Sequence, residues 1–182
     1  ITFNIPTIIT HCSNNYGPWQ FPEKLIPLVI IKALRGDIIP IYGDGLNIRD
    51  WLYVEDHIKA ILAACFKGKV GSNYCIGGGE EKTNKEVVFS ICNLLDLYVP
   101  KKVSYQSLIS YVDDRPGHDY RYSIDFSLIK KELGWNPEFS FKSGIDMTVR
   151  WYINNIHWCN SILKESNYNA DRLGIKNFSQ SK

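Results

Sequence analysis

The chain has 182 residues, of which 45% are hydrophobic and 22% are charged, so it can bury a core as one domain or as two small lobes. Its 21 basic and 19 acidic side chains nearly cancel, and no run of lysines or arginines argues for nucleic acid or a membrane surface, which favours a small-molecule partner. The longest apolar stretches, near residues 25–31 and 58–66, are far shorter than a bilayer span, and no signal-like segment opens the chain, so the sequence predicts a soluble, cytoplasmic protein.

The cysteines and the start of the chain lead to two further expectations. The cysteines are scattered and lack the paired spacing that zinc or redox motifs need. We therefore expect no metal, and buried thiols at Cys12, Cys65, Cys75, Cys92 and Cys159. The chain opens on Ile1, almost directly on a strand-like run, and its only methionine is Met147. We expect it to be a piece of a longer protein.

The first elements predicted are a strand, a loop, a helix and a second strand. The β-branched run at 7–10 indicates a buried strand, and the polar stretch at 13–18 indicates a loop. A helix is expected from Pro22, which suits a first turn, to Gly36, which suits a C-terminal end. A short strand at 38–42 then meets a turn whose glycines tolerate positive φ.

Two amphipathic helices follow, separated by another strand. Apolar residues recur at helical spacing between 54 and 65, with acidic residues in the first turn and lysines near the end. The segment 73–76 indicates a strand, which the glycines at 77–79 end. Thr83 and Glu86 have the spacing of a capping box, and the apolar residues after them predict a helix.

A charged loop and a short helix come next. Short strands are expected at 109–112 and 121–124, on either side of the loop at 113–120. Asp125 then has the character of a helix cap, and Gly134 suits the end of that helix.

The last predicted helix is amphipathic and begins near Ser140, and a polar tail, expected to be disordered or loosely docked, begins near Asn167. Strands alternate with helices through most of the chain. The sequence therefore predicts an α/β fold with at least some parallel strand pairing.

Three segments carry groups that suit a nucleotide diphosphate. Such a ligand needs fixed positive charge for its phosphates, apolar or aromatic faces for its base, and amides or hydroxyls for its sugars. The first segment has two adjacent amides, Asn14 and Asn15, after a strand, where open α/β sheets bind ligands, and a cation, Lys24, soon afterwards. The same amides also fit a turn that satisfies its own backbone, and both interpretations stay open.

The second segment runs from 48 to 56. If it is extended and Trp51 is buried, Arg49 points to the same face, where its guanidinium must be paired with an anion. That anion is either a ligand or a structural partner, Asp50 or Asp56. The sequence does not rank these two interpretations.

The third segment, 113–119, places an arginine, a histidine and three carboxylates close together. Solvated loops are often charged, and that explanation is the commoner one. A rigid Pro-Gly turn between Arg115 and His118 would instead hold the two donors in a fixed relation that suits a diphosphate.

Other motifs do not indicate a site. The glycines at 77–79 lack the pattern of a phosphate-binding loop and indicate a turn. Tyr98 and Lys102 have the spacing of a Tyr-x-x-x-Lys pair, but Pro100 between them should break the helix. Ligand partners at metal spacing are also lacking for His11, His57 and His157.

Taken in order, five motifs resemble the dTDP-glucose 4,6-dehydratases, a branch of the extended short-chain dehydrogenase/reductases. Each motif alone is shared with related epimerases and dehydratases, but the ordered set is specific. The resemblance runs from about residue 6 to about residue 158, through the motifs Cys12–Pro18, Phe21–Pro27, Tyr42–Gly45, Asn47–His57 and Asp114–Asp119.

The resemblance implies an α/β fold, namely the C-terminal part of an extended short-chain dehydrogenase/reductase. This part would hold the last Rossmann strands and the small mixed α/β substrate-binding domain. Residues 1–20 would be the terminal strand and loop of the Rossmann domain, residues 21–165 the nucleotide-sugar-binding region with interspersed Rossmann elements, and residues 166–182 a polar tail.

The resemblance also implies binding roles for particular residues. Asn15 would contact the nicotinamide side of NAD, Arg49 and Arg115 would hold the diphosphate, and Pro40, Ile41 and Tyr42 would frame the thymine. The rest of the substrate pocket would come from Asn14, Lys24, Leu25, Asn84, Asp114, Pro116, Gly117 and His118. None of these residues would be the catalytic acid or base.

The implied activity is NAD-dependent dehydration of dTDP-glucose to dTDP-4-keto-6-deoxyglucose, a deoxysugar precursor. The catalytic Tyr-x-x-x-Lys pair, the acidic dehydration pair and the Gly-rich loop that binds most of NAD belong to a part of the family pattern that this chain lacks. We therefore expect this chain to be inactive alone, and the complete protein to form a homodimer. The alternatives are a UDP-sugar 4,6-dehydratase or epimerase, and a non-catalytic nucleotide-sugar-binding module.

Overall fold

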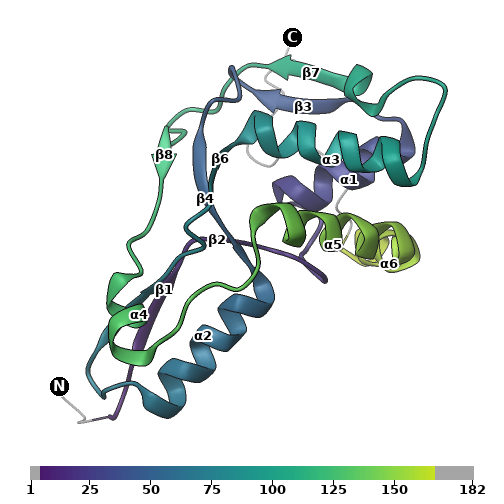
Figure 1. Ribbon diagram of the computed structural model, residues 1–182. Helices are drawn as coiled ribbons and strands as arrows, with labels where there is room; N and C mark the ends of the chain where they lie inside the picture. The colour runs from purple at the N-terminus through teal and green to yellow at the C-terminus, as the bar shows by residue number, and fades with distance from the viewer. Residues whose placement is uncertain (1–4, 167–182) are drawn as a thin grey trace.

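The computed structural model describes residues 5–166, and it contains six helices and eight strands in that range (Figure 1). The strands are β1 (Ile9–Cys12), β2 (Asn14–Tyr16), β3 (Ile39–Tyr42), β4 (Ile48–Tyr53), β5 (Asn73–Ile76), β6 (Glu81–Thr83), β7 (Ile109–Val112) and β8 (Arg121–Tyr122). The helices are α1 (Leu25–Arg35), α2 (Val54–Lys67), α3 (Asn84–Tyr98), α4 (Ser127–Leu133), α5 (Phe141–Asn154) and α6 (Ile156–Glu165), with a 3-10 turn at Tyr105–Leu108.

The described strands form three small sheets that are mostly parallel. β1 pairs with β5, and β3 pairs with β7, both in parallel. β4 is the centre of the third sheet, where it pairs in parallel with β2 and β8 and antiparallel with β6. The predicted α/β fold with parallel pairing is confirmed.

The elements lie in two groups, with β4 between them (Figure 1). Helices α1, α3 and α5 pack on one another and share a large apolar core with β3. Helices α2 and α4 pack against β5 around a smaller core that contains Leu52, Tyr74 and Trp135. Because side chains alternate along a strand, β4 contributes Trp51 and Tyr53 to the large core and Leu52 to the small one.

Two elements near the N-terminus differ from the prediction. The first strand lies at Ile9–Cys12, two residues later than expected, and it is not buried, since Ile9 is 50% exposed. Its edge opposite β5 has no partner strand in the described part of the chain. The predicted loop at 13–18 contains strand β2, because Asn14–Tyr16 pairs with Trp51–Tyr53. This pairing partner is distant in sequence, so no local pattern reveals it.

The predicted helix ends are largely confirmed. Gly36 and Gly134 adopt left-handed conformations and close α1 and α4. Asp125 accepts a hydrogen bond from the Ser127 backbone N–H at the start of α4, and Ser140 caps α5. Helix α1 begins at Leu25 rather than at Pro22, because residues 22–24 form a turn.

Several features were not predicted. Strand β6, the 3-10 turn and helix α6 have no counterpart in the sequence analysis, and Asn155 separates α5 from α6. The expected polar tail from Asn167 lies outside the described residues. The expectation of buried thiols is correct for Cys92 and Cys159 and wrong for Cys65, which is exposed, while the other two cysteines are half-buried.

Helix α2 forms as predicted, but its apolar stripe is exposed. The buried face consists of Asp56, Ala60 and Ala64. The stripe that the helical spacing indicated includes Ile58, Ile61 and Leu62, which are 42–52% exposed. No described residue covers this face, and no described helix is long and apolar enough to cross a bilayer.

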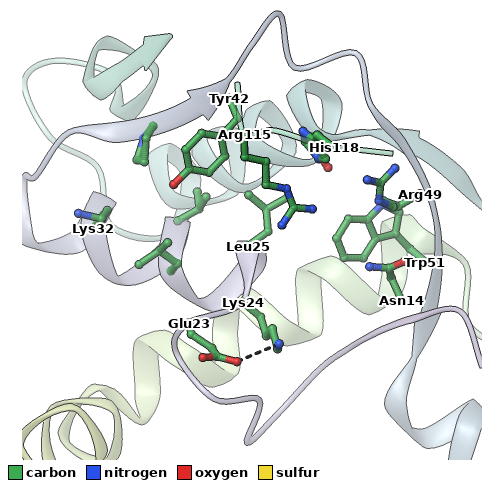
Figure 2. A pocket seen from close by; sticks show the side chains of 14 residues that line it. Asn14, Glu23, Lys24, Leu25, Lys32, Tyr42, Arg49, Trp51, Arg115 and His118 are labelled. Carbon is green, nitrogen blue, oxygen red and sulfur yellow. Dashed lines mark ion pairs between the residues drawn. The ribbon is translucent and has the colours of Figure 1, made fainter. Parts of the chain in front are cut away.

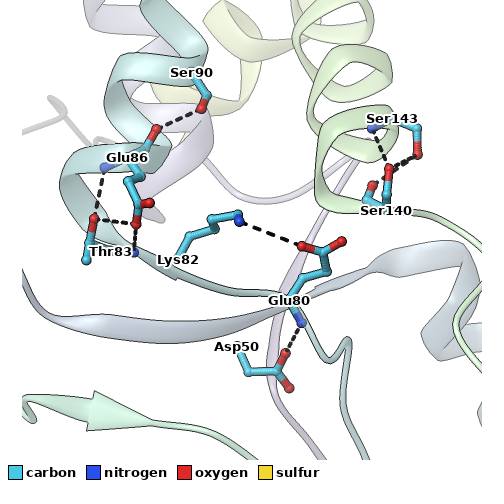
Figure 3. Close-up of polar contacts among 8 residues, drawn as sticks. All are labelled: Asp50, Glu80, Lys82, Thr83, Glu86, Ser90, Ser140 and Ser143. Carbon is cyan, nitrogen blue, oxygen red and sulfur yellow. Dashed lines mark hydrogen bonds and ion pairs between the residues drawn. The ribbon is translucent and has the colours of Figure 1, made fainter.

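The capping box at the start of α3 is present as predicted (Figure 3). The Glu86 backbone N–H donates to Thr83 Oγ1 at 3.1 Å, and the Glu86 carboxylate accepts from the Thr83 backbone N–H at 2.7 Å. Asn84, the first residue of the helix, donates its backbone N–H to the Asn47 carbonyl. The capping box therefore fixes where α3 begins, and the Asn84 bond ties that point to the residue just before β4.

Replacing Thr83 with alanine should lower the free energy of unfolding by about 1 kcal/mol, because it leaves a helix N-terminal N–H without its acceptor. Urea denaturation followed by circular dichroism measures this loss. Ser90→Ala is a matched control, since the Ser90 hydroxyl only donates to the Glu86 carbonyl inside the same helix. Equal losses in the two variants would contradict the capping role.

Candidate functional site

A cavity of about 320 Å³ lies between α1, β3, β4 and the loop that precedes β8 (Figure 2). This volume is at the lower end of the range for small-molecule sites. The three segments that the sequence analysis selected all reach it. The lining residues are Asn14, Glu23, Lys24, Leu25, Leu28, Val29, Lys32, Pro40, Tyr42, Arg49, Trp51, Asn84, Arg115 and His118.

Strand β4 places Arg49 and Trp51 on the face that lines the cavity, as the sequence analysis expected of an extended segment. Arg49 is only 8% exposed. Its guanidinium donates to two backbone carbonyls, those of Ile48 at 2.6 Å and Asp119 at 2.8 Å. These contacts hold the side chain in position, and no carboxylate among residues 5–166 bonds to its guanidinium.

The structural ion pairs considered for Arg49 do not form. The carboxylate of Asp50 accepts from the backbone N–H groups of Gly78 and Glu80, both at 3.1 Å. The carboxylate of Asp56 accepts from two backbone N–H groups at residues 138 and 139, both at 3.0 Å. Of the two interpretations of Arg49 that the sequence left open, the internal pair with Asp50 or Asp56 is wrong.

Arg49 and Arg115 line the same cavity (Figure 2). Burial is the main cause that lowers the pKa of Arg49; the carboxylate of Asp119 opposes this, and the positive charge of Arg115 lowers the pKa further. Two guanidinium groups that repel each other in one cavity favour an anion between them.

The loop from Asp114 to His118 is held by short-range bonds around Gly117, which takes a φ of +68°. Asp114 Oδ1 lies 2.7 Å from His118 Nδ1 and accepts from the Arg115 backbone N–H at 2.8 Å. The hydrogen bond with His118 is the main cause that lowers the pKa of Asp114. The turn therefore brings Arg115 and His118 to the same cavity, as the sequence analysis expected of a rigid Pro-Gly turn.

Some predicted site residues support the cavity without lining it. Ile41 is 2% exposed and packs in the large core, because alternation along β3 turns Pro40 and Tyr42 toward the cavity instead. Asp114 orients His118, and Pro116 and Gly117 form the turn. Asn15 donates its side-chain amide to the Ser13 carbonyl at 3.1 Å, and its Oδ1 is buried with no hydrogen-bond partner among residues 5–166.

Five lining residues were not assigned to the site from the sequence: Glu23, Leu28, Val29, Lys32 and Trp51. Helical spacing from Leu25 would have identified three of them, since residues three, four and seven positions later share one helix face. Glu23 forms an ion pair with its neighbour Lys24 at 2.9 Å (Figure 2).

The rejected motifs remain outside the cavity. Tyr98 is the last residue of α3, and its hydroxyl bonds to Asp146 and Arg150, so it does not form a pair with Lys102 on one helix face. The glycines at 77–79 follow β5, and Gly78 lies against the backbone of β4 at Trp51. Residues 5–166 contain no cluster of three or more side chains that could hold a metal ion.

The arrangement combines the three kinds of group that a nucleotide diphosphate needs. Cations come from Arg49, Arg115 and Lys24, and amides come from Asn14 and Asn84. Apolar and aromatic faces come from α1 and β3. Guanidinium groups can donate two parallel hydrogen bonds to phosphate oxygens. The ring of Tyr42 and the apolar side chains can pack against the face of a base.

The chain is similar in sequence to several proteins named dTDP-glucose 4,6-dehydratase. The chain is 58% identical to the dTDP-glucose 4,6-dehydratase of Salmonella typhimurium over 161 residues, which are 88% of this chain and 45% of that protein. It is 51% identical to the enzyme of the same name from Neisseria meningitidis serogroup B over 177 residues, 95% of this chain and 50% of that protein. The chain thus spans about half the length of the curated relatives it matches.

Solved structures agree with this similarity. The dTDP-glucose 4,6-dehydratase of Bacillus anthracis in complex with NAD matches with a TM-score of 0.79 and 49% identity, over 88% of this chain and 49% of that one. The Streptomyces venezuelae dTDP-glucose 4,6-dehydratase DesIV, with NAD and TYD bound, matches with a TM-score of 0.82 and 42% identity. The match covers 88% of this chain and 48% of that one. The Thermotoga maritima UDP-glucose 4-epimerase with UDP-glucose matches with a TM-score of 0.70 and 28% identity. The match covers 82% of this chain and 46% of that one.

These relatives confirm the resemblance to dTDP-glucose 4,6-dehydratases and the short-chain dehydrogenase/reductase fold that it implied. A family model also covers most of the chain, since residues 1–148 match the one described as GDP-mannose 4,6 dehydratase. The chain therefore belongs to that family of nucleotide-sugar dehydratases.

Proposed function

We propose that this chain is the nucleotide-sugar-binding part of an NAD-dependent dTDP-glucose 4,6-dehydratase. The observation that carries the proposal is the presence of Arg49 and Arg115 in one cavity, beside the aromatic ring of Tyr42. The sequence similarity to dehydratases of that name supports the choice of substrate.

The cationic and apolar residues that line the cavity would orient the ligand. The diphosphate would lie between Arg49 and Arg115, with His118 as a further donor. The base would lie against Leu25, Pro40 and Tyr42, which form the apolar side. The glucose would then extend past Trp51 toward Asn14, whose amide offers both a donor and an acceptor to its hydroxyls.

One residue of this chain is proposed to contact NAD. The buried Asn15 Oδ1 has no hydrogen-bond partner among the described residues, so it can accept from a donor such as the nicotinamide amide. Asn15 would thus help to hold NAD, which would supply a hydride acceptor, and in its reduced form a hydride donor, for the glucose. Most of the NAD site would lie in the half of the relatives' length that this chain does not span.

This chain alone should bind dTDP-glucose but should not dehydrate it. The cavity offers cations and amides, whereas Tyr98 and Lys102, the one Tyr-x-x-x-Lys match, do not share a helix. Calorimetric titration would measure binding, and an assay for the 4-keto-6-deoxy sugar with added NAD would measure turnover. The complete Salmonella typhimurium enzyme is the positive control. Absence of dTDP-glucose binding would contradict the binding role, and product formation by this chain would contradict the assignment of catalysis to the rest of the enzyme.

A second candidate is a UDP-sugar 4,6-dehydratase or epimerase, which the similarity to the Thermotoga maritima UDP-glucose 4-epimerase favours. Thymine and uracil differ by one methyl group, which is worth about 1 kcal/mol in an apolar pocket. Competition between dTDP-glucose and UDP-glucose for the cavity separates the two candidates. The dTDP-glucose assignment predicts several-fold tighter binding of the dTDP sugar.

A further inference from the structure

One lysine that lines the cavity, Lys32, takes no part in the proposed binding of the diphosphate, base or glucose. Lys32 lies on α1, seven residues after Leu25, so it shares the helix face that Leu25, Leu28 and Val29 turn toward the cavity. The structure records no ion pair or side-chain hydrogen bond for its ammonium group among residues 5–166. Arg35, also a cation in the last turn of α1, does not line the cavity and donates to Asn160 instead.

Lys32 lies at the end of the cavity that is remote from Arg49. Seven residues of α-helix advance by about 10 Å, so Lys32 lies about two turns from Leu25. Figure 2 shows Lys32 at one end of the cavity and Arg49 at the other, with Tyr42 and Arg115 between them. A ligand with its diphosphate at the arginines therefore presents its opposite end, the far edge of the base, to Lys32.

The chemistry of a lysine limits what it can recognise at that edge. An ammonium group only donates hydrogen bonds, so it requires an acceptor. In a pyrimidine nucleotide the ribose is attached at N1, and the substituent at C4 lies on the far side of the ring. Thymine and uracil carry a carbonyl oxygen there, whereas cytosine carries an amino group that is itself a donor.

We propose that Lys32 donates a hydrogen bond to O4 of the base and so selects thymine or uracil over cytosine. The proposal rests on the proposed function, because it takes the position of the diphosphate from Arg49 and Arg115. It adds a residue that determines base specificity and places that residue on α1.

Titrations of three ligands into the wild-type chain, Lys32→Met and the control Arg35→Met test this proposal. The ligands are dTDP, dCDP and inorganic pyrophosphate. Loss of one charge-assisted hydrogen bond should weaken dTDP binding to Lys32→Met by about 10-fold or more, with dCDP binding nearly unchanged. The preference of the wild type for dTDP over dCDP should therefore largely disappear in this variant. Arg35→Met, which also removes one positive charge from α1, should keep that preference.

Pyrophosphate distinguishes base recognition from a general attraction of anions. Its affinity should be nearly equal in the wild type and in Lys32→Met. A parallel loss for pyrophosphate, dTDP and dCDP would overturn the proposal and make Lys32 a general cation. An unchanged ratio of dTDP to dCDP affinity in Lys32→Met would also overturn it, while leaving the proposed function intact. Failure of the wild type to bind dTDP or pyrophosphate at all would instead contradict the proposed function.

Discussion

Replacing Arg115 with glutamine should weaken dTDP binding by about 10- to 100-fold, the effect of removing a charge-assisted contact to phosphate. Arg115 is exposed on its loop and lines the cavity beside Arg49. Burial is the main cause that lowers the pKa of Arg49 and the charge of Arg115 lowers it further, so removing Arg115 should not reduce the stability of the free protein. Calorimetric titration measures the affinity, and thermal denaturation checks the fold.

Arg121→Gln is a matched control for this variant. Arg121 follows the same loop, but it pairs with Glu81 on the surface and does not line the cavity. Its replacement should leave the dTDP affinity within about twofold of the wild-type value, because Arg121 does not line the cavity. The fold should also persist, since an exposed ion pair contributes little to stability. Equal losses in the Arg115 and Arg121 variants would indicate nonspecific attraction by positive charge rather than a phosphate contact.

Replacing Gly78 with alanine should lower the free energy of unfolding by about 3 kcal/mol, because the added methyl group would force residue 78 away from the backbone of β4. A Cβ atom at this position would lie 1.9 Å from the Trp51 carbonyl oxygen and 2.7 Å from its carbonyl carbon. The Gly78 backbone N–H also donates to the buried carboxylate of Asp50. The substitution therefore disturbs β4, the strand that carries Arg49, and should weaken dTDP binding as well.

Gly71→Ala separates this close contact from the general effect of losing a glycine. Gly71 takes a φ of +85°, and a Cβ there would have no atom within 4 Å. Its replacement should cost about 1 kcal/mol for the left-handed backbone alone. Urea denaturation of both variants measures the difference. A Gly78 variant as stable as the Gly71 variant would contradict the close contact between residue 78 and β4.

The helices could be predicted from the sequence because their signals are local. Thr83 and Glu86 form the capping box that their spacing indicated, and Gly36 and Gly134 close their helices in the left-handed conformation. Such signals depend on a few neighbouring residues, so the chain carries them wherever the helix packs. The helical spacing in α2 was equally local, but whether its apolar stripe is covered depends on the rest of the structure.

Strand pairing and the site geometry could not be predicted in this way. Asn14–Tyr16 appeared to be a loop because its partner, Trp51–Tyr53, is distant in sequence. The same pairing brings Asn14 beside Trp51 at the cavity. The residue types of the site could be selected from their chemistry. Only the fold shows that these residues meet at one cavity. It also shows that Asp50 bonds to backbone N–H groups, which leaves Arg49 available to the cavity.

The central claim is that Arg49 and Arg115 together bind one diphosphate. The most direct measurement is the ratio of the affinities for dTDP and thymidine, in the wild type and in the double variant Arg49→Gln, Arg115→Gln. We expect the wild type to bind dTDP at least about 100-fold more tightly than thymidine, and the double variant to lose nearly all of that difference. A double variant that folds and still prefers dTDP by the wild-type ratio would contradict the claim, because the diphosphate would then bind elsewhere.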